Sequence, residues 1–552
     1  MAQAAEAAEV DVDRLSSLPD GVLGHILSFL PTYEAGRAAV LSSRWRHILA
    51  SAHTFSFDQP ESPFTDCESC YYSYVDEKQS RNYYFLNAVT AAFLCRRRCA
   101  GGRDPPLRVF RVSFDWYHRW DGAMVDRWLA CATRNGAKEL RHVELRLEGG
   151  REACDYEDPY RSTKLEDKMY KQVTDSSEDE DDLEGRGIPN FIEPDSDGNN
   201  VDEGYHWQEK LDYTVPKRIF TCVALRTLCL GGCLLNLPAT ISLPSLETLL
   251  LTGLIDSEEV MQRLISSCPC LVDLTLEACS KVHTISVLDT HLRRLALRCC
   301  HKLLSVTVDS SDLRVFEYKG AVPSPSLLTL HGDAQRISSC TIDFCGKELS
   351  MIGQFVWFKK LLRMFVGTKH LHLRSDCLGS GFEDPIFKRF PVFCRLRHLE
   401  LTGRLQHYHA VDAITRILMQ APNLEVLSLV ILPVSDHHPE DSPPLGYWQG
   451  DTTISCLRDH VREIKMVHYQ GLEVQRKLLK FLLHNALVLD EICCVFPKGP
   501  LDRETEMMNE IKAPFGLRDF FLFLRFSCEQ STDSCEIPVK ILRSKGGLKD
   551  GL

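Results

Sequence analysis

Leu225-Arg-Thr-Leu-Cys-Leu230 decides the fold of this chain, because its pattern, Leu-x-x-Leu-x-Leu, returns at regular intervals behind it. Full copies begin at Leu246, Leu271 and Leu292, and a degenerate copy, Leu-Arg-Val-Phe-Glu-Tyr, begins at Leu313. Successive starts lie 21, 25, 21 and 21 residues apart. A unit of this length cannot bury its own apolar face, so the copies are expected to stack into a solenoid.

The ninth position of the unit also favours a solenoid of stacked repeats. Cys233, Cys279 and Cys300 fall there, where a small side chain that can hydrogen-bond a turning backbone suits a buried slot. Three more copies begin at Leu396, at Leu424 and, in a shorter form, at Lys369. The pattern and period are those of a leucine-rich repeat, so we expect an α/β fold with a parallel sheet on the concave face of an irregular solenoid.

Residues 14–50 carry a dense helical pattern. In Leu18-Pro-Asp-Gly-Val-Leu-Gly-His-Ile-Leu-Ser-Phe-Leu-Pro31, Pro19 suits a first helical turn and Pro31 ends the helix. One apolar stripe at helical spacing is formed by Leu23, Ile26, Leu27 and Leu30. A second helix is expected over residues 34–41, and Ser42 or Ser43 can cap a third that carries Trp45. Three helices in about 35 residues make a small core, which either a partner or the solenoid should complete.

Three motifs in this segment stand in order: Leu18-Pro-Asp, Leu27-Ser-Phe-Leu-Pro and Ala39-Val-Leu-Ser-Ser-Arg-Trp-Arg. Together they resemble the plant F-box closely. Asp126-Arg-Trp-Leu with Leu140-Arg-His-Val-Glu-Leu resembles the first repeat of the plant F-box/leucine-rich-repeat family. Cys456-Leu-Arg-Asp-His-Val-Arg-Glu-Ile with Phe481-Leu-Leu-His-Asn-Ala-Leu resembles its C-terminal FBD region, although the family's Ala-Pro is Ala486-Leu487 here.

The resemblance implies a division of labour. The F-box would bind a Skp-family adaptor, which docks to a cullin scaffold, and the repeats would hold a protein substrate near the ubiquitin-charged enzyme. The positions that match the adaptor-facing and supporting residues of the motif are Leu18, Pro19, Leu23, Leu27, Leu30, Pro31, Val40 and Leu41. Trp45 is expected to be mainly core. Replacing Leu27 and Leu30 by Ala should then abolish adaptor binding. The alternative is a repeat-based interaction scaffold that does not engage a ligase.

The composition excludes several classes of protein. The chain has 552 residues, 25% of them charged, and a net charge of −12, which counts against a protein built to coat nucleic acid. No apolar stretch is long enough for a membrane span, and the small, acidic N-terminus is not a secretory signal. An odd count of 23 cysteines without a signal indicates reduced thiols and a location in the cytoplasm or nucleus.

Residues 150–212 interrupt the pattern. The run Asp175-Ser-Ser-Glu-Asp-Glu-Asp-Asp is strongly acidic and poor in apolar residues, which predicts a disordered, solvated spacer. The alternative interpretation is that its serines are targets of kinases that prefer acidic flanks. Elsewhere we expect helices near 83–98, 126–136 and 473–485, and strands near 107–114, 140–147, 456–467 and 489–496. The predicted organisation is a disordered N-terminus (1–13), the F-box (14–50), a linker helix with first irregular repeats (53–149), the acidic insertion (150–212), leucine-rich repeats (213–432), an FBD-like region (454–526) and a loose tail (527–552).

No motif for catalysis or a cofactor is present: there is no phosphate-binding glycine loop, nucleophile elbow or zinc-protease helix, so we expect neither enzyme activity nor a cofactor. Cys67 and Cys70 with Cys95 and Cys99 have unusual spacing for a zinc site. The pair His437-His438 fits a solvated turn better than a ligand pair. Arg96-Arg97-Arg98 suits a basic helix end, which the helix dipole favours.

Alternate residues of each repeat strand should line the concave face, because the leucines point inward. This places Asp273 beside Arg294 in a parallel sheet, and Glu277 beside Arg298, which neighbours Lys319. The residues so predicted for possible substrate binding are Asp273, Glu277, Arg294, Arg298, Glu317 and Lys319, with Thr275, Ala296 and Val315 between them. One interpretation is a ladder of ion pairs that keeps the face soluble. The other is a seat for an acidic or phosphorylated segment at Arg298 and Lys319, which have only Glu277 close by. If that seat fails, the loops at 376–395 and 433–453 are the next candidates.

Overall fold

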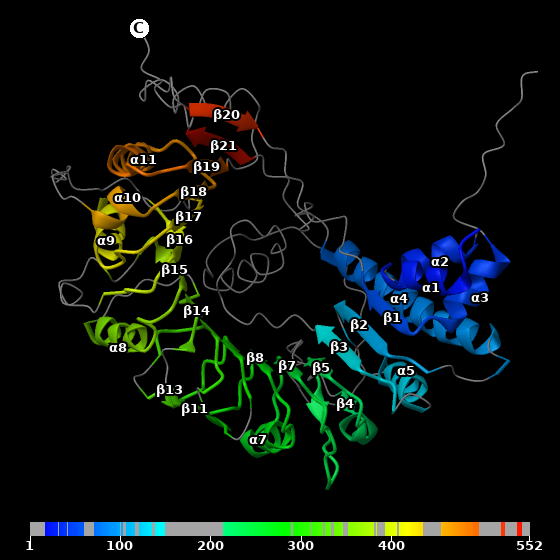
Figure 1. Ribbon diagram of the computed structural model, residues 1–552. Coiled ribbons are helices and arrows are strands. Elements are labelled where there is room, and N and C mark those ends of the chain that lie inside the picture. Colours follow the sequence, from blue (N-terminus) through cyan, green and yellow to red (C-terminus); the bar gives the residue numbers. More distant parts are fainter. Residues whose placement is uncertain are drawn as a thin grey trace, which may run out of the picture.

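A computed structural model shows the repeats as one long arch with the N-terminal helices at one end (Figure 1). It describes residues 17–30, 32–40, 42–59, 71–99, 101–102, 106–115, 117, 121–134, 138–148, 213–288, 291–309, 311–323, 326–332, 336–345, 352–379, 382, 392–405, 408–433, 454–495, 520–524 and 538–543. The whole acidic insertion (150–212) lies outside these residues, as do the loop 434–453 and Cys67, Cys70, His437 and His438.

The arch is built on one sheet of 16 described strands, in the order β1-β2-β3-β5-β7-β8-β10-β12-β14-β15-β16-β17-β18-β19-β21-β20. Neighbours from β1 to β19 are parallel, and only the last two pairings are antiparallel. The strands up to the middle are β1 (Thr54–Asp58), β2 (Val109–Asp115), β3 (His142–Glu148), β5 (Thr227–Gly231), β7 (Thr248–Thr252), β8 (Asp273–Glu277), β10 (Arg294–Arg298), β12 (Val315–Lys319) and β14 (Ser339–Asp343). The rest are β15 (His370–Cys377), β16 (His398–Arg404), β17 (Val426–Leu432), β18 (Glu463–Val467), β19 (Glu491–Val495), β20 (Phe520–Leu524) and β21 (Pro538–Arg543).

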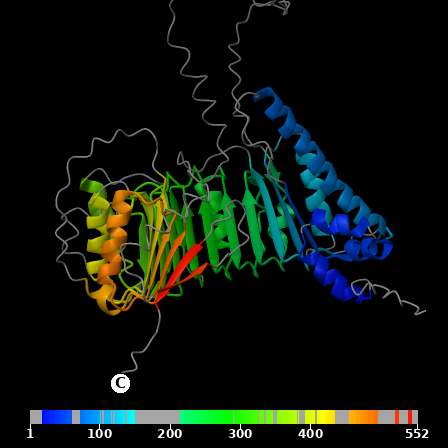
Figure 2. The same ribbon diagram turned by 90° about the horizontal axis from the view of Figure 1, so that it is seen from above.

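Helices lie on the convex side, and the strands stand in a row when the molecule is seen from above (Figures 1 and 2). They are α4 (Tyr71–Cys99), α5 (Gly122–Arg134), α7 (Glu258–Ser266), α8 (Ile352–Arg363), α9 (Tyr408–Met419), α10 (Ser455–Asp459) and α11 (Glu473–Asn485). Where repeats lack a helix, short strands take its place: β9 (Thr284–Val287), β11 (Ser305–Asp309) and β13 (Leu328–His331) form a second parallel sheet, and β4 (Thr214–Val215) pairs with β6 (Leu234–Leu235). None of the described helices combines the length and apolar character that crossing a membrane needs.

Each repeat buries the leucines of its pattern. Leu225, Leu228 and Leu230 are fully buried, as are their counterparts in the next repeats. The chain then turns through a residue with positive φ at the eighth position, which is Gly232, Gly253, Ala278 and Cys299 in four successive copies. The cysteine slot behaves as predicted: the Cys279 thiol donates to the carbonyl oxygens of Leu251 (3.7 Å) and Glu277 (3.5 Å). The repeat prediction is therefore confirmed down to its ninth position.

Two predictions at the C-terminal end are wrong. Residues 456–467 were expected to form one strand, but α10 ends at Asp459 and β18 begins at Glu463. The reason is that Cys456 and Leu457 are both buried in the core, which a helical turn allows and an alternating strand does not. The tail 527–552 was expected to be loose, but β21 lies between β19 and β20. Its apolar run, Val-Lys-Ile-Leu, pairs antiparallel with β19, which would otherwise be the open edge of the sheet.

Several element predictions agree well. Helix α11 has the predicted bounds, 473–485, and β2, β3 and β19 match the predicted strands to within two residues. The predicted helix 83–98 starts earlier, at Tyr71. One repeat was missed: β14 belongs to Ile337-Ser-Ser-Cys-Thr-Ile, in which Cys340 replaces the second leucine.

Candidate functional site

The N-terminal unit is a bundle of three short helices, α1 (Asp20–Ser28), α2 (Thr32–Val40) and α3 (Ser43–Ser51). Its core consists of Leu23, Leu27, Ala35 and Ile48, with Leu18, Trp45 and Leu49 packed against it and partly buried. The arginine of the Ser-Ser-Arg-Trp motif fastens the bundle. Arg44 donates to the Asp20 carboxylate at 2.6 Å and to the carbonyl oxygen of Leu18, so α3 is tied to the start of α1.

The structure divides the predicted adaptor residues into two groups. Leu23 and Leu27 are buried in the bundle core, whereas Pro19 and Leu30 are exposed. Leu27 and Leu30 were predicted to lie on one helix face, and this is wrong because α1 ends at Ser28 and Leu30 lies two residues beyond it. Their part in adaptor binding stays a prediction. The side chains of Pro31, Val40 and Leu41 lie outside the described residues.

Exposed apolar side chains on α1 and in the two residues after it form the surface that an adaptor could cover. Val22 is 45% exposed, Phe29 74% and Leu30 38%. Val22, Ile26 and Phe29 follow at i, i+4 and i+7, which gives α1 a second apolar stripe beside the buried one. The sequence analysis missed Val22 and Phe29. The signal was present, because a nine-residue helix with apolar residues on two stripes can bury only one of them in a three-helix bundle.

A buried arginine joins this bundle to the solenoid. Arg96, near the end of α4, is 4% exposed and donates to the carbonyl oxygen of Ala52, just after α3, and to that of Pro106, just before β2 (3.1 Å). Its guanidinium also lies 5.0 Å from the ring centre of Phe55 in β1. The prediction of a solvated basic helix end therefore holds for Arg97 and Arg98, which are exposed, but is wrong for Arg96.

The concave face carries the predicted register. Arg294 lies opposite Asp273 on one side and Val315 on the other, and Arg298 lies between Glu277 and Lys319. The predicted face is only partly open, because Thr275 and Ala296 are buried. Arg294 reaches over Thr275, with its Nη1 3.4 Å from the hydroxyl oxygen, which shows how long side chains cover the short ones between them.

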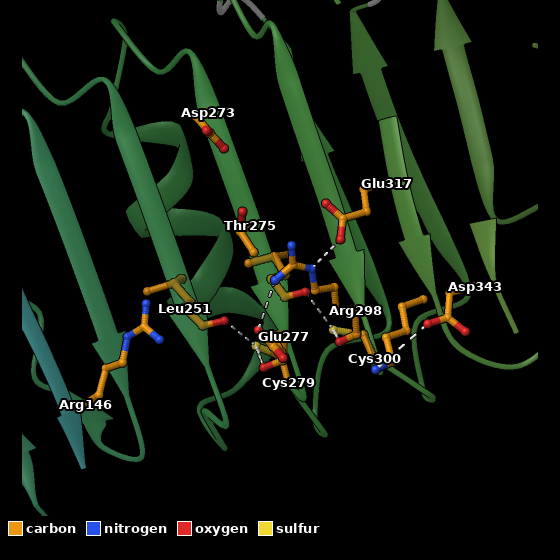
Figure 3. Close-up of polar contacts among 12 residues, drawn as sticks. Arg146, Leu251, Asp273, Thr275, Glu277, Cys279, Arg298, Cys300, Glu317 and Asp343 are labelled. Atoms are coloured by element: carbon orange, nitrogen blue, oxygen red, sulfur yellow. Dashed lines mark hydrogen bonds and ion pairs between the residues drawn. The ribbon is translucent and has the colours of Figure 1, made fainter. Parts of the chain in front are cut away.

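Charges on this face compensate one another (Figure 3). Glu317 accepts hydrogen bonds from Arg298 Nε at 2.6 Å and Arg294 Nη2 at 2.9 Å. Arg298 also pairs with Glu277 at 3.7 Å, and Lys319 Nζ lies 4.0 Å from Asp343. The hypothesis of uncompensated cations at Arg298 and Lys319 is therefore wrong: Glu317, which the strand alternation places on the same face, lies between the two arginines, and Asp343 came from the repeat that was missed.

No group of three or more histidine, cysteine or acidic residues suited to a metal ion occurs among the described residues. Cys95 and Cys99 are exposed thiols near the end of α4. The buried thiols of the repeats are poor nucleophiles, since burial raises the pKa of Cys229 to about 11 and that of Cys268 to about 12.

Comparisons with known proteins address both parts of the chain. Residues 15–56 match the F-box domain, and residues 203–320 match the leucine-rich repeats of FBD-associated F-box protein At5g56370. The repeat match begins inside the range 150–212 that we assigned to the acidic insertion.

Similar proteins from Arabidopsis thaliana cover nearly the whole chain. F-box/LRR-repeat protein At2g42730 is 24% identical over 96% of this chain and 98% of its own length. FBD-associated F-box protein At4g10400 is 23% identical over 95% and 99%, respectively. F-box protein At4g27050 is 35% identical, but over only 24% of this chain and 28% of its own length. The chain is therefore similar to plant F-box/leucine-rich-repeat proteins across most of its length, with an F-box domain and FBD-associated repeats as the matching parts.

Proposed function

We propose that this F-box protein is the substrate-recognition subunit of an SCF-type ubiquitin ligase and has no catalytic activity of its own. The observation that carries the proposal is the apolar surface of α1 and the two residues after it, where Val22, Phe29 and Leu30 are exposed although the bundle core is complete without them. An apolar patch beside a fixed bundle is typical of a protein-binding surface. A Skp-family adaptor is the partner that F-box domains generally bind.

The rest of the molecule suits the same role. Arg96 fixes the F-box to the first strands, so that a substrate held along the arch would keep a defined position relative to the adaptor. The repeats would capture a protein substrate, and the conserved chemistry of ubiquitin transfer would belong to other subunits. The proposal places the protein in the cytoplasm or nucleus, and the described cysteines support this, because they are free thiols.

The first prediction tests the adaptor surface. Replacing Phe29 and Leu30 by Ser should reduce recovery of adaptor and cullin by at least about tenfold, because two apolar anchors of the interface are lost. Both side chains are exposed in the free protein, so the bundle should remain folded. The measurement is co-purification of the full chain from plant cells, with circular dichroism of the purified variant.

Tyr84→Ser is the matched control, since Tyr84 on α4 is 72% exposed and Phe29 is 74% exposed. This variant should recover adaptor and cullin normally. Normal recovery by the folded Phe29/Leu30 variant would contradict the proposal and leave an interaction scaffold as the better description of the chain.

A further inference from the structure

One edge of the sheet carries a single file of residues that precede the strands, and we call it the starting edge. In the full copies each is the second residue of the Leu-x-x-Leu unit, and from Arg108 onward the main-chain N–H of each member donates to the carbonyl oxygen of the member before it. Adjacent members are therefore about 4.8 Å apart. The file is His53, Arg108, Arg141, Arg226, Glu247, Val272, Arg293, Arg314, Ser338, Lys369, Arg397, Glu425, Arg462 and Asp490.

The starting edge is basic, in contrast to the balanced concave face. Eight of its 14 members are Arg or Lys, all of them exposed, and three are acidic. Each of the three carboxylates forms an ion pair with a neighbouring arginine of the file: Glu247 with Arg226, Glu425 with Arg397 and Asp490 with Arg462. Among the described residues, no ion pair is formed by Arg108, Arg141, Arg293, Arg314 or Lys369.

The charge is densest between β10 and β16. Arg293, Arg314 and Lys369 stand in the file, and the exposed Arg336 and Arg395 precede the file members of their repeats by two residues. Asp312 is the acidic side chain beside them, and it already accepts from His291 at 2.9 Å. A hydrogen bond from His291 lowers the pKa of Asp312, and the charges of His291, Arg314 and Arg293 lower it further. Five neighbouring strands span about 19 Å, which equals about six residues of extended chain.

The distribution of charge along the chain sets this edge apart. Residues 149–212 hold 20 acidic and seven basic residues and so carry −13, which leaves +1 for the rest of the chain out of a total of −12. Outside residues 149–212 the chain is therefore almost neutral overall, and the starting edge gathers an excess of cations within it. Its arginines are suited to carboxylate and phosphate groups, which they bind through a planar fork of donors.

We propose that the starting edge at Arg293, Arg314 and Lys369 binds an extended acidic or phosphorylated segment of a protein partner. Nucleic acid is the less suitable occupant, because no Phe, Tyr or Trp stands in the file and bases would find no aromatic stacking platform among its members. The proposal names a class of substrate and in that respect rests on the proposed function, but the contact itself needs neither adaptor nor cullin.

The test uses the purified full chain and a fluorescent six-residue peptide of alternating glutamate and phosphoserine. Replacing Arg293, Arg314 and Lys369 by Gln should weaken peptide binding by about tenfold or more, because three charge-assisted contacts are lost. The dependence of affinity on salt should also become shallower. The measurement is fluorescence anisotropy at two salt concentrations.

A matched control removes three exposed cations from convex-side helices, with the substitutions Lys360→Gln, Arg363→Gln and Lys480→Gln. This control should bind the peptide within twofold of the unchanged protein. Equal losses in both variants, or no binding by the unchanged protein at low salt, would overturn the proposal. Tighter binding of an oligouridylate of equal charge would assign the edge to nucleic acid instead. Adaptor recovery should be normal in the edge variant, so failure here is distinguishable from failure of the proposed function.

Discussion

Glu317 shows how one residue decides the character of the concave face. The sequence placed it on the exposed side of β12, but strand alternation alone gives no distances between side chains. In the structure it accepts from both Arg294 and Arg298, so two cations four residues apart on strand β10 share one carboxylate. The register of the candidate site was therefore predicted correctly, and of the two interpretations of its charges the ladder of ion pairs agrees with the structure. The uncompensated cations do not, because the charge balance depends on rotamers of long side chains.

The second prediction concerns Glu317→Gln, which should lower the free energy of unfolding by about 1–2 kcal/mol at pH 7. Burial acts to raise the pKa of Glu317, but the hydrogen bond and charge of Arg298, followed by those of Arg294, hold it below its ordinary value of 4.5. The stabilisation is thus present above pH 4.5 and is lost as the pH falls through the lower pKa of the folded state.

Urea unfolding of both proteins between pH 7 and pH 3 measures this difference. Glu247→Gln is the control, because Glu247 is 49% exposed and faces one arginine at 3.5 Å, so its loss should cost less than about 0.5 kcal/mol. A difference for Glu317→Gln that stayed constant down to pH 3 would contradict the ion-pair explanation.

At the scale of elements, the repeat is specified by leucines that point inward and by a turn that needs positive φ. Spacing and alternation predicted most strands of the long sheet, because the repeats share one sequence pattern, but not β1, β14, β20 or β21. They failed where the core was filled by other residues: Cys340 stands for leucine in β14, and Cys456 and Leu457 enter the core from a short helix. The strand β21 was missed because its partner, β19, is 42 residues earlier, and no local signal reports a long-range antiparallel pairing.

The third prediction compares two glycines at the same position of adjacent repeats. Gly232 and Gly253 both have φ of 62°, but an added Cβ would lie 1.9 Å from the Leu147 carbonyl oxygen at Gly232 and 3.9 Å from the main-chain nitrogen of Gly232 at Gly253. Gly253→Ala should therefore cost about 1 kcal/mol, which is the strain of a left-handed residue. Gly232→Ala should cost about 3 kcal/mol or more, because β3 and β5 must separate.

Ala278 and Cys299 occupy the same position with φ of 52°, so the turn itself accepts a side chain. The measurement is the midpoint of urea unfolding for the two single variants. Equal costs would show that the backbone strain, and not the contact between β3 and β5, governs this position.

At the scale of the whole molecule, the F-box and the repeats form one continuous structure. The main chain of β1 follows α3 directly, Thr32 of α2 accepts a hydrogen bond from the Ser56 N–H of β1, and Arg96 bridges the two parts. The sequence left open whether a partner or the solenoid completes the small bundle. The structure shows that the solenoid supports one side while α1 keeps an exposed apolar stripe.

The last prediction is that residues 160–204 are dispensable for folding. The chain leaves the sheet after β3 and returns at Tyr213, and both anchors are firmly held: β3 is paired on both sides, and the buried Tyr213 donates to Asp126 at 3.0 Å. Excision shortens the connection between these anchors from 64 residues to 19, which should favour the folded state by about 1 kcal/mol through a smaller loop-closure entropy.

The thermal transition of the excised protein should therefore stay within about 2 °C of the full chain. Tyr213→Ala is the comparison, because it removes the anchor while keeping the insertion, and loss of a buried aromatic side chain costs about 3–5 kcal/mol. Differential scanning calorimetry should show a transition several degrees lower for this variant alone. If excision lowered the transition as much as Tyr213→Ala does, the acidic residues would contribute packing of their own, and their composition would be a misleading guide to their role.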